Sequence, residues 1–440
     1  MDFITDLQQT LMKQIPEMMA DYEGDVSAQS LSEMEVCVKQ MMHELGNEIM
    51  GQWLEAQEQK YPDECKRCPH CGGEAQYVRR REGMSITLQG RVYYRRAYYG
   101  CCHCPQGFYP LDERLGIEAG QMSTEVIHLA ALFGIEDAFG TCHDLLQRAT
   151  LLELSPNSIR KASQKVGETV VSYEEILHER SQSLEVQREQ QRDEQKPERL
   201  YGSLDGFMVL LKTGWHEMKA GTWWTTQTTK QGETKAQDMH YYTDLLPAQD
   251  FSDLVWATGF KQQADQAQEL IFVADGAEWI WKIVQQHYPQ AVQIVDWYHA
   301  CAYIAPVAKK AFTNPHEGQA WIEETKTALW QGDLDAVITA CQDYITPDLK
   351  PKDDPAQQAV TYYRNNRQRM DYPTYRAQDY QIGSGTMESG CKRVGLERLK
   401  IAGARWTDDG ARLVAKARAT YLSGDWDKLN SWGDTLPHVA

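Results

Sequence analysis

The sequence predicts an α+β protein of several domains, in which a mixed sheet with flanking helices follows a helical, cysteine-containing first half. Three observations support this class. The chain has 440 residues, too many for a single core. Two CxxC pairs lie within residues 65–104. From residue 199 onward, runs of aromatic and β-branched residues replace the helical periodicity of the first half, which indicates strands.

Composition narrows the class of protein further. No run of eighteen or more apolar residues occurs, and the N-terminal Met1-Asp-Phe-Ile-Thr-Asp lacks the basic start and apolar stretch of a signal peptide, so we expect a cytoplasmic protein. The eleven cysteines are odd in number, and six of them cluster at residues 65–104. This usage favours metal binding in a reducing compartment over a disulfide framework.

The formal net charge of −18 argues against a nucleic-acid-binding surface over the whole molecule. Basic residues are concentrated in two windows, 78–96 and 391–418, and a third basic group lies near residue 160. Local positive patches of this kind can contact phosphates. The candidate DNA-binding residues are Arg79, Arg80, Arg81, Arg95, Arg96, Arg160, Lys161, Lys165, Lys392, Arg393, Arg398, Lys400, Arg405 and Trp406.

Residues 1–60 are predicted to be helical. Ser32 and Glu35 have the spacing of a capping box, and apolar residues recur every three or four positions from Met34 to Trp53. Such a one-sided stripe indicates core packing or a helical dimer contact, and a DNA-contacting role is a further alternative.

Residues 61–112 are predicted to form a zinc ribbon. Two CxxC knuckles, Cys68/Cys71 and Cys101/Cys104, are separated by enough chain for a β-hairpin, which would bring four thiolates into a tetrahedron around one structural Zn²⁺. Cys65, Cys102, His70 and His103 are possible substitutes, so the ligand set stays open at this point.

Residues 113–172 carry three predicted helices, the last beginning at Ser155-Pro156, an N-cap followed by proline. Short helices with brief turns suggest a helix-turn-helix, although three-helix packing without DNA contact fits equally well. Residues 173–198 are mostly charged or amide side chains, which indicates a solvated helix or a linker.

The last part of the chain, from residue 199, is predicted to be the catalytic domain. Three consecutive strands are followed by a strand, a helix and another strand, over residues 199–302. This order is that of an RNase H-like fold. Residues 303–378 are helical and polar, as expected for an all-α insertion, and residues 379–440 return to the catalytic domain with C-terminal helices.

Three carboxylates stand out in this domain. Asp205 interrupts an apolar strand, Asp275 ends a buried strand, and Glu388 lies in a helix-like segment rich in glycine. If they meet, they could hold two Mg²⁺ (or Mn²⁺) ions for phosphoryl transfer, one activating the attacking oxygen and the other stabilising the leaving oxygen. Taken singly, Asp275 could be a turn or helix cap and Glu388 a surface residue.

Several segments together carry a resemblance: Cys68-Pro-His-Cys71-Gly-Gly, Pro110-Leu-Asp-Glu, Leu204-Asp205-Gly, Gly383-Ser-Gly-Thr-Met-Glu388-Ser and Arg405-Trp406. With them the chain resembles the DDE transposases of bacterial insertion sequences, in the Kra-type family, related to Mutator-like and hAT-like transposases. The resemblance spans most of the chain and implies that Asp205, Asp275 and Glu388 are the metal-binding triad.

The resemblance also covers Asp296-Trp-Tyr-His299, which matches a [Cys/Asp]-x-x-His signature of that wider branch. His299 is thus a candidate catalytic residue that contacts a phosphate or a flanking base, with a core histidine as the alternative. Asp296 is expected to orient its helix rather than bind metal. Arg405 and Trp406 could contact DNA, or the tryptophan could pack beside a surface arginine.

The sequence therefore predicts a nucleoid-associated DNA transposase that cleaves transposon ends and transfers the strands into target DNA. A dimer or larger homo-oligomer is expected, because two ends must be joined at once. The alternatives are a catalytically inactive, zinc-containing DNA-binding regulator and a metal-dependent nuclease without strand transfer. No membrane partner is expected.

Overall fold

The computed structural model of the chain describes residues 3–20, 30–58, 62–117, 121–192, 196–228 and 234–434. The chain divides into two compact units, residues 1–163 and 164–440. The division falls within one continuous helix, α6 (Pro156–Gln182). No helix among the described residues combines the length and the apolar character needed to cross a bilayer.

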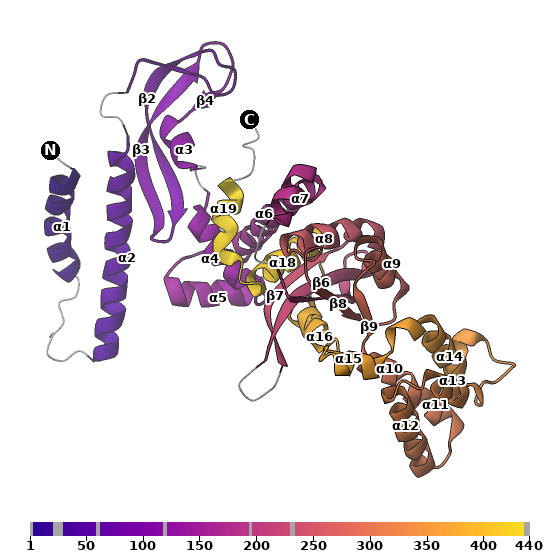
Figure 1. Cartoon of the computed structure of the whole chain (residues 1–440). Helices are drawn as coiled ribbons and strands as arrows, with labels where there is room; N and C mark the ends of the chain where they lie inside the picture. Colours follow the sequence, from indigo (N-terminus) through magenta and orange to yellow (C-terminus); the bar gives the residue numbers. More distant parts are fainter. Residues whose placement is uncertain are drawn as a thin grey trace. The chain divides into compact units, whose positions relative to one another are not determined.

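Unit 1 begins with two helices, α1 (Phe3–Ala20) and α2 (Leu31–Ala56). The capping box of α2 is formed by Ser30 and Glu33, two residues before the pair with the predicted spacing, since both pairs satisfy the same pattern. No residue of α2 is buried. The helix lies against strand β3 (Gly90–Cys101) (Figure 1) through polar contacts, in which Glu55 Oε1 accepts from the backbone N–H of Arg95. The predicted core packing of its stripe is therefore not found.

A small antiparallel sheet follows, in the order β1-β2-β3-β4. Strands β2 (Glu74–Thr87) and β3 form a long hairpin whose tight turn closes at Gly90, with φ of 93° that glycine adopts without strain. The hairpin predicted between the two knuckles is thus present. The two short outer strands are β1 (Cys65–Arg67) and β4 (Gly107–Phe108).

The predicted trio of helices follows the sheet. Helix α3 (Pro110–Leu115) is a single short turn, and then come α4 (Thr124–Gly134), α5 (Phe139–Thr150) and α6. Ser123 caps α4, and Ser155 accepts from the N–H of Ser158 at the start of α6. Helices α4 and α6 therefore begin at serine caps, as the Ser155-Pro156 pattern predicts for α6, whereas α5 follows Ala138 without a side-chain cap.

The centre of unit 2 is a mixed five-stranded sheet in the order β7-β6-β5-β8-β9. The first three strands form an antiparallel meander, and β8 and β9 run parallel to β5. This is the strand–strand–strand, then strand–helix–strand succession that the sequence predicts. The elements are β5 (Arg199–Leu211), β6 (Gly214–Thr228), β7 (Thr234–Asp244), α8 (Ala248–Lys261), β8 (Glu269–Ala274), α9 (Glu278–His287) and β9 (Val292–Val295).

Large aromatic side chains fill the core of this sheet. Trp223 is fully buried and meets Phe272 and Tyr288 edge to face, at ring-centroid distances of 5.3 and 5.7 Å. Such aromatic pairs contribute beyond the apolar area that they bury. They join β6 to β8 across the intervening strand β5, which carries Asp205.

The segment after β9 is helical throughout, as predicted for the all-α insertion (Figure 1, brown to orange). Cys341 and Tyr363 belong to the same buried cluster as the sheet core, so the insertion packs onto the sheet. Helix α10 (Trp297–Ala302) precedes the insertion, whose helices are α11 (Ile304–Ala311), α12 (Pro315–Trp330), α13 (Leu334–Gln342), α14 (Pro355–Asn365) and α15 (Tyr372–Ala377), with 3₁₀ turns η2 (Pro351–Asp353) and η3 (Arg367–Arg369).

The C-terminal helices return to the sheet. Helix α16 (Gly385–Cys391) leads into a π-helical stretch, η4 (Lys392–Leu396), and α18 (Asp408–Leu422) lies along β7. The buried Lys416 of α18 pairs with both Glu174 of α6 and Asp244 of β7. The remaining elements are α17 (Glu397–Leu399), η5 (Trp426–Lys428) and α19 (Leu429–Asp434).

The segment predicted as a solvated helix or linker is largely helical up to Gln191. Helix α6 runs to Gln182 and α7 (Leu184–Gln191) follows at once. Tyr173 stacks on Trp432 with ring centroids 3.9 Å apart. Together with the Glu174–Lys416 pair, this contact anchors the segment to the C-terminal helices. The charged composition of the segment did not indicate such packing.

Candidate functional site

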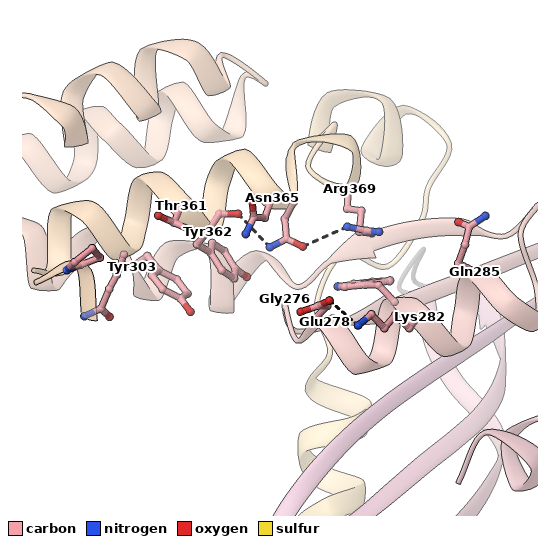
Figure 2. Close-up of a pocket in the computed structure, with 13 residues that line it drawn as sticks. Gly276, Glu278, Lys282, Gln285, Tyr303, Thr361, Tyr362, Asn365 and Arg369 are labelled. Carbon is pink, nitrogen blue, oxygen red and sulfur yellow. Dashed lines mark hydrogen bonds and ion pairs between the residues drawn. The ribbon is translucent and has the colours of Figure 1, made fainter. Parts of the chain in front are cut away.

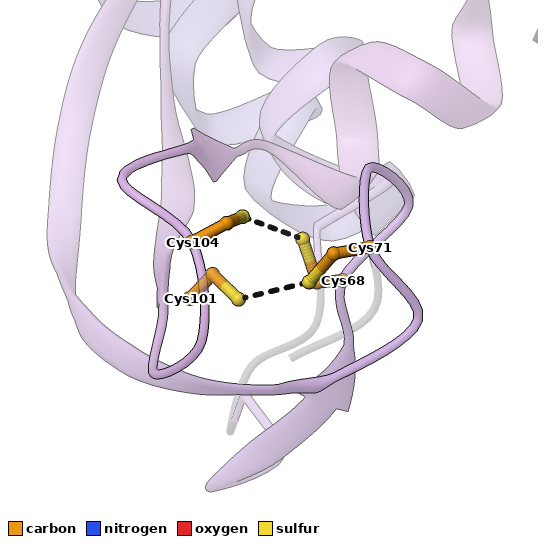
Figure 3. Close-up of side chains that lie close together, drawn as sticks. All are labelled: Cys68, Cys71, Cys101 and Cys104. Atoms are coloured by element: carbon orange, nitrogen blue, oxygen red, sulfur yellow. Dashed lines mark hydrogen bonds between the residues drawn. The ribbon is translucent and has the colours of Figure 1, made fainter.

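The first candidate site is a cluster of four cysteines in unit 1. Cys68 and Cys71 come from the turn before β2, while Cys101 and Cys104 come from the end of β3 and the turn after it. Figure 3 shows the two pairs facing each other, with Sγ–Sγ distances of 3.8 Å for Cys68–Cys104 and 3.5 Å for Cys71–Cys101. Sulfur atoms on a tetrahedral zinc ion lie about 3.8 Å apart, so this arrangement could hold such a metal.

Local hydrogen bonds form the two knuckles. The N–H of Cys68 donates to the carbonyl of Gly73, and the N–H of His103 donates to Cys101 Sγ at 3.3 Å. That backbone donor is the largest reason why the pKa of Cys101 falls to about 6, which favours the thiolate that binds metals. Repulsion within a thiolate cluster is relieved by a bound cation.

The four-cysteine set is the one group in the described ranges in which three or more ligand atoms from His, Cys, Asp or Glu lie within 4.8 Å of one another. The alternative ligands, which are Cys65, Cys102, His70 and His103, are not members. Cys65 is exposed and donates to Glu74 Oε1 at 3.2 Å, and Cys102 is exposed. The geometry thus reduces the open choice among six cysteines to Cys68, Cys71, Cys101 and Cys104.

The second candidate site is acidic and lies on the sheet of unit 2. Strands β5 and β8 pair in parallel, and the last paired residues are Gly202 and Phe272. Asp205 and Asp275 lie equally far beyond this pair in the sequence. Ser203 Oγ donates to the carbonyl of Val273 at 2.5 Å and ties the strands together just before the two aspartates. Adjacent parallel strands therefore bring two carboxylates to one edge.

The electrostatics of Asp205 reflect this pairing. Burial raises the pKa of Asp205, and the neighbouring Asp275 raises it further. Its Oδ1 accepts from the N–H of Gly206 at 2.7 Å, and Cys391 Sγ lies 3.6 Å from its Oδ2. Asp275 Oδ1 accepts from the N–H of Ala277, so it also caps the turn into α9, the structural role considered above. Two crowded carboxylates favour a bound cation.

His299 lies beside these acids on α10. A hydrogen bond to Asp296 is the largest factor that raises the pKa of His299, and Asp275 and Asp205 add to it. The His299 side chain is 56% exposed. It is therefore not a core histidine, and its imidazolium form is available to an anionic ligand near the two aspartates.

Asp296 links α10 to the segment that precedes α16. Its Oδ1 caps α10 by accepting from the N–H of His299 at 2.6 Å, and its Oδ2 accepts from the N–H of Ser384. The N–H of Trp297 also donates to the carbonyl of Ile382 at 2.9 Å. Asp296 is buried and orients its helix, and it also fixes the entry into the helix of Glu388.

Glu388 is exposed on α16, which packs against β5. It lies one helical turn before Cys391, whose thiol contacts Asp205, so the two side chains share a face of the helix. The structure brings Asp205, Asp275 and His299 into electrostatic contact. It does not bring Glu388 into a tight group with the aspartates, because no such group is found among the described residues.

The predicted DNA-binding residues of unit 1 differ in accessibility. Arg79, Arg80 and Arg95 are exposed on the long hairpin, whereas Arg81 is half-buried with its guanidinium over the Tyr98 ring. Arg96 is 2% exposed and its Nε pairs with Asp112 at 2.6 Å. The Arg96 side chain is thus occupied in the fold and not displayed to a ligand.

Helix α6 carries the next predicted basic group. Arg160 is half-buried and donates to Asn157, while Lys161 is exposed. Lys165 is exposed, with Glu168 at 3.6 Å. These three side chains lie on the helix that the sequence assigns to groove contact, and a surface ion pair such as Lys165–Glu168 holds its lysine only weakly.

The basic residues after α16 divide in the same way. Lys392, Lys400 and Arg405 are exposed and Arg393 is half-buried. Arg398 is 2% exposed and lies over the ring of Trp406, whose Nε1 donates to the carbonyl of Leu399. Trp406 therefore packs in the fold beside an exposed Arg405, the second of the two alternatives for this pair.

Residues 27–435 match the model of an uncharacterised protein family, UPF0236. The chain belongs to this family. No curated protein matches the sequence. The match covers both units, so the cysteine cluster and the acidic edge belong to one family architecture.

Two contributors to the acidic site had no distinct signal in the sequence. Cys391 reads as an apolar helix residue, and only the packing of α16 on β5 places its thiol next to Asp205. Ser203 reads as a small residue within a strand, although its hydroxyl joins β5 to β8. Pairing between distant strands cannot be read from local patterns.

Proposed function

We propose that this chain is a DDE-type DNA transposase, which cleaves DNA at transposon ends and joins the ends to target DNA. The observation that carries the proposal is the placement of Asp205 on β5 and of Asp275 directly after the parallel neighbouring strand β8, with the pKa of Asp205 raised by burial and by Asp275. The strand order β7-β6-β5-β8-β9 is the order expected of an RNase H-like fold. The resemblance of the Asp205 and Glu388 segments to DDE transposases supports the same assignment.

In this proposal the residues have distinct roles. Asp205 and Asp275 bind divalent cations, and Glu388 joins them from α16. Two Mg²⁺ (or Mn²⁺) ions would neutralise the phosphate and promote in-line displacement at phosphorus. Carboxylates that share a pair of ions about 4 Å apart need not all lie within one small sphere, so the exposed position of Glu388 is compatible with this role.

His299 acts on the substrate rather than on the cations. Its raised pKa keeps more of the imidazole protonated near neutral pH. An imidazolium beside the two aspartates can donate to a phosphate oxygen and stabilise the charge that develops there. Asp296 holds His299 in place through the contacts described above.

Unit 1 contributes DNA binding in this proposal. The exposed Arg79, Arg80 and Arg95 lie on a two-stranded ribbon that could follow a groove or a phosphate backbone. Zinc at the four cysteines would fix the end of that ribbon. Dimerisation, or a larger homo-oligomer, and location at the nucleoid in the cytoplasm are parts of the same proposal, since two DNA ends must be joined.

The test uses the full chain with DNA that carries both flanks of its gene, in Mg²⁺ or Mn²⁺. We expect nicked ends and a strand-transfer product, and we expect Asp205→Asn to lower the rate at least about 10³-fold. His299→Gln should cost about 10²-fold. The exposed Asp409→Asn serves as the matched control and should retain activity.

Other outcomes separate the alternatives. Cleaved ends without joined product would identify a metal-dependent nuclease. Binding to the flanks with no cleavage in either metal, and no change on Asp205→Asn, would identify a catalytically inactive DNA-binding regulator. Either result would overturn the transposase proposal.

A further inference from the structure

A large cavity lies beside the acidic edge of unit 2, between the sheet domain and the helical insertion. Its volume is about 920 Å³, within the range of about 300–1,000 Å³ that is typical of small-molecule sites. Figure 2 shows Gly276, Glu278 and Lys282 on one side and Tyr303, Tyr362 and Asn365 on the other. Because Gly276 directly follows Asp275, the cavity opens next to the proposed metal site.

The lining combines aromatic rings with amides. Tyr303 and Tyr362 stack with ring centroids 3.9 Å apart. Asn365, Asn366, Gln285 and Gln358 add side-chain amides, each able to donate and accept hydrogen bonds. Planar rings and paired donor and acceptor groups are what a nucleobase requires from a protein.

Two lining residues have buried donors without a partner. Among the described residues, the indole Nε1 of Trp281 and the hydroxyl of Tyr362 are buried and make no hydrogen bond. Trp281 as a whole is only 4% exposed. A buried donor without an acceptor costs free energy, so two in one cavity point to an acceptor-bearing ligand that completes the site.

The charges of the cavity suit an anionic group. Arg369 lies with its guanidinium 4.6 Å from the centroid of the Trp281 ring. Lys282 pairs with Glu278 at 2.7 Å, and both are exposed at the rim. The charged lining residues are Arg369, Lys282 and Glu278, so the cavity has a net positive charge to offer to a phosphate.

The backbone at Gly276 leaves the room that this arrangement needs. A Cβ atom there would lie 2.2 Å from Cε2 of Tyr362 and 2.9 Å from Nδ2 of Asn366. Glycine therefore allows the Tyr362 ring to approach the end of β8. The carboxylate of Asp275 is close enough to contribute to the raised pKa of Tyr362, after burial and Tyr303.

We propose that this cavity binds one unpaired nucleotide, with its base between the aromatic and amide side chains and its phosphate toward Arg369 and Lys282. The inference rests on the proposed function and adds a subsite to it, beside the cleavage position. The nucleotide could belong to a DNA strand or be a free mononucleotide. The aromatic and amide lining is common to both sources, and the position beside Asp275 favours the strand.

The experiment measures binding by the full, zinc-containing chain in buffer without added Mg²⁺ or Mn²⁺, so that no reaction dependent on these ions takes place. The probes are 5-iododeoxyuridine monophosphate, a single-stranded oligonucleotide with one 5-iododeoxyuridine, and the blunt duplex of the same sequence. Illumination should crosslink the strand probe to residues 276–285 or 358–369, as identified by mass spectrometry. The blunt duplex should give little crosslink there, and crosslinking of the free monophosphate would identify it as the occupant.

Two variants test the buried donors. Tyr362→Phe should weaken binding of the crosslinked probe about tenfold, as expected for one lost hydrogen bond to a ligand. Its melting temperature should stay unchanged or rise, because the hydroxyl has no partner inside the protein. Trp281→Phe should also weaken binding. Tyr421→Phe, an exposed tyrosine on α18 outside the cavity, is the matched control.

Crosslinks confined to other segments, together with unchanged binding by Tyr362→Phe, would overturn the subsite. The result does not depend on catalysis. If the wild-type chain cleaves DNA but does not bind the nucleotide probes, the subsite alone is refuted. Intact nucleotide binding without metal-dependent cleavage would refute the transposase proposal and leave the nucleotide site.

Discussion

The two candidate metal sites of this chain are built in opposite ways. In the cysteine cluster, two tight knuckles at the ends of one hairpin bring four Sγ atoms within 4.8 Å of one another. The acidic edge takes Asp205 and Asp275 from neighbouring strands, and Glu388 from a helix more than a hundred residues later. The first is closed by local chain geometry, and the second depends on long-range packing.

This difference has a chemical consequence. A structural zinc site surrounds its ion with protein ligands and leaves no position for a substrate. A site that binds Mg²⁺ for phosphoryl transfer must keep positions for water and phosphate oxygens, so few carboxylates in a loose arrangement suit it. We therefore expect replacement of a cysteine ligand to disrupt the local fold around the cluster. Replacement of an aspartate at the acidic edge should instead remove the effect of divalent cations on stability and activity.

The largest effect is expected at the cysteines. Cys68→Ser should lower the zinc content from about one ion per chain to nearly none, since serine cannot replace a thiolate ligand. Elemental analysis measures the content, and hydrogen exchange over residues 62–117 measures the loss of local order. Cys102→Ser is the matched control, because Cys102 is exposed and outside the four-cysteine group. An equal loss of zinc in the control would place the ligands elsewhere.

The second effect concerns cation-dependent stability of unit 2. Mn²⁺ at a hundred times its dissociation constant should stabilise the wild-type protein by about 2.7 kcal/mol, because it binds the folded state alone. Asp275→Asn should remove most of this gain, and Asp409→Asn should not. Calorimetry with and without Mn²⁺ gives the comparison. Stabilisation that persists in Asp275→Asn would contradict a cation site at this edge.

Acidification should separate the two regions. Protons compete with zinc for thiolates, so acidification should release the zinc. In unit 2, burial opposes ionisation of Asp425 and Asp354, but Lys261 and Lys428 hold the pKa of Asp425 below 3.8, and Lys310 holds that of Asp354 below 3.8. Their contribution to stability is present above pH 3.8 and is lost as the pH falls through the lowered pKa values.

A chromogenic zinc chelator and circular dichroism, followed from pH 8 to pH 3, measure both events. Zinc release should precede loss of the sheet signal by at least one pH unit. Simultaneous loss of both would show that the two units unfold together and would remove the contrast between them.

The smallest effect is expected from Asp296→Ser. Serine still caps α10, but it cannot also accept from the N–H of Ser384, so the entry to α16 loosens. We expect the metal-dependent rate to fall about tenfold, while the melting temperature changes by only a few degrees. Asp333→Ser at the N-cap of α13 is the matched control. Equal rates for the two variants would refute a positioning role for Asp296.

Much of the local structure was predictable because it depends on neighbouring residues. Ser123 and Ser155 mark helix starts through their own hydroxyls, and the runs around Asp205 and Asp275 form strands as their composition indicates. Capping patterns that overlap, such as Ser30/Glu33 and Ser32/Glu35, are not resolved by spacing alone.

The accessibility of charged residues was not predictable. Arg96 is in the middle of an arginine-rich strand but pairs with the buried Asp112, and Arg398 is in a basic segment but lies under the surface against Trp406. Charge along the sequence says where cations are concentrated, whereas only packing decides which of them face the solvent.

The sequence by itself determined the two knuckles, the strand and helix succession and the identity of the acidic residues, because each of these depends on residue type and short spacing. Only the tertiary structure decided which four of the clustered cysteines meet, that Asp205 and Asp275 are neighbours through the parallel pairing of β5 and β8, and that a cavity with unpartnered donors lies beside Asp275. These features arise between segments far apart in the chain, where contact is fixed by packing and not by local preference.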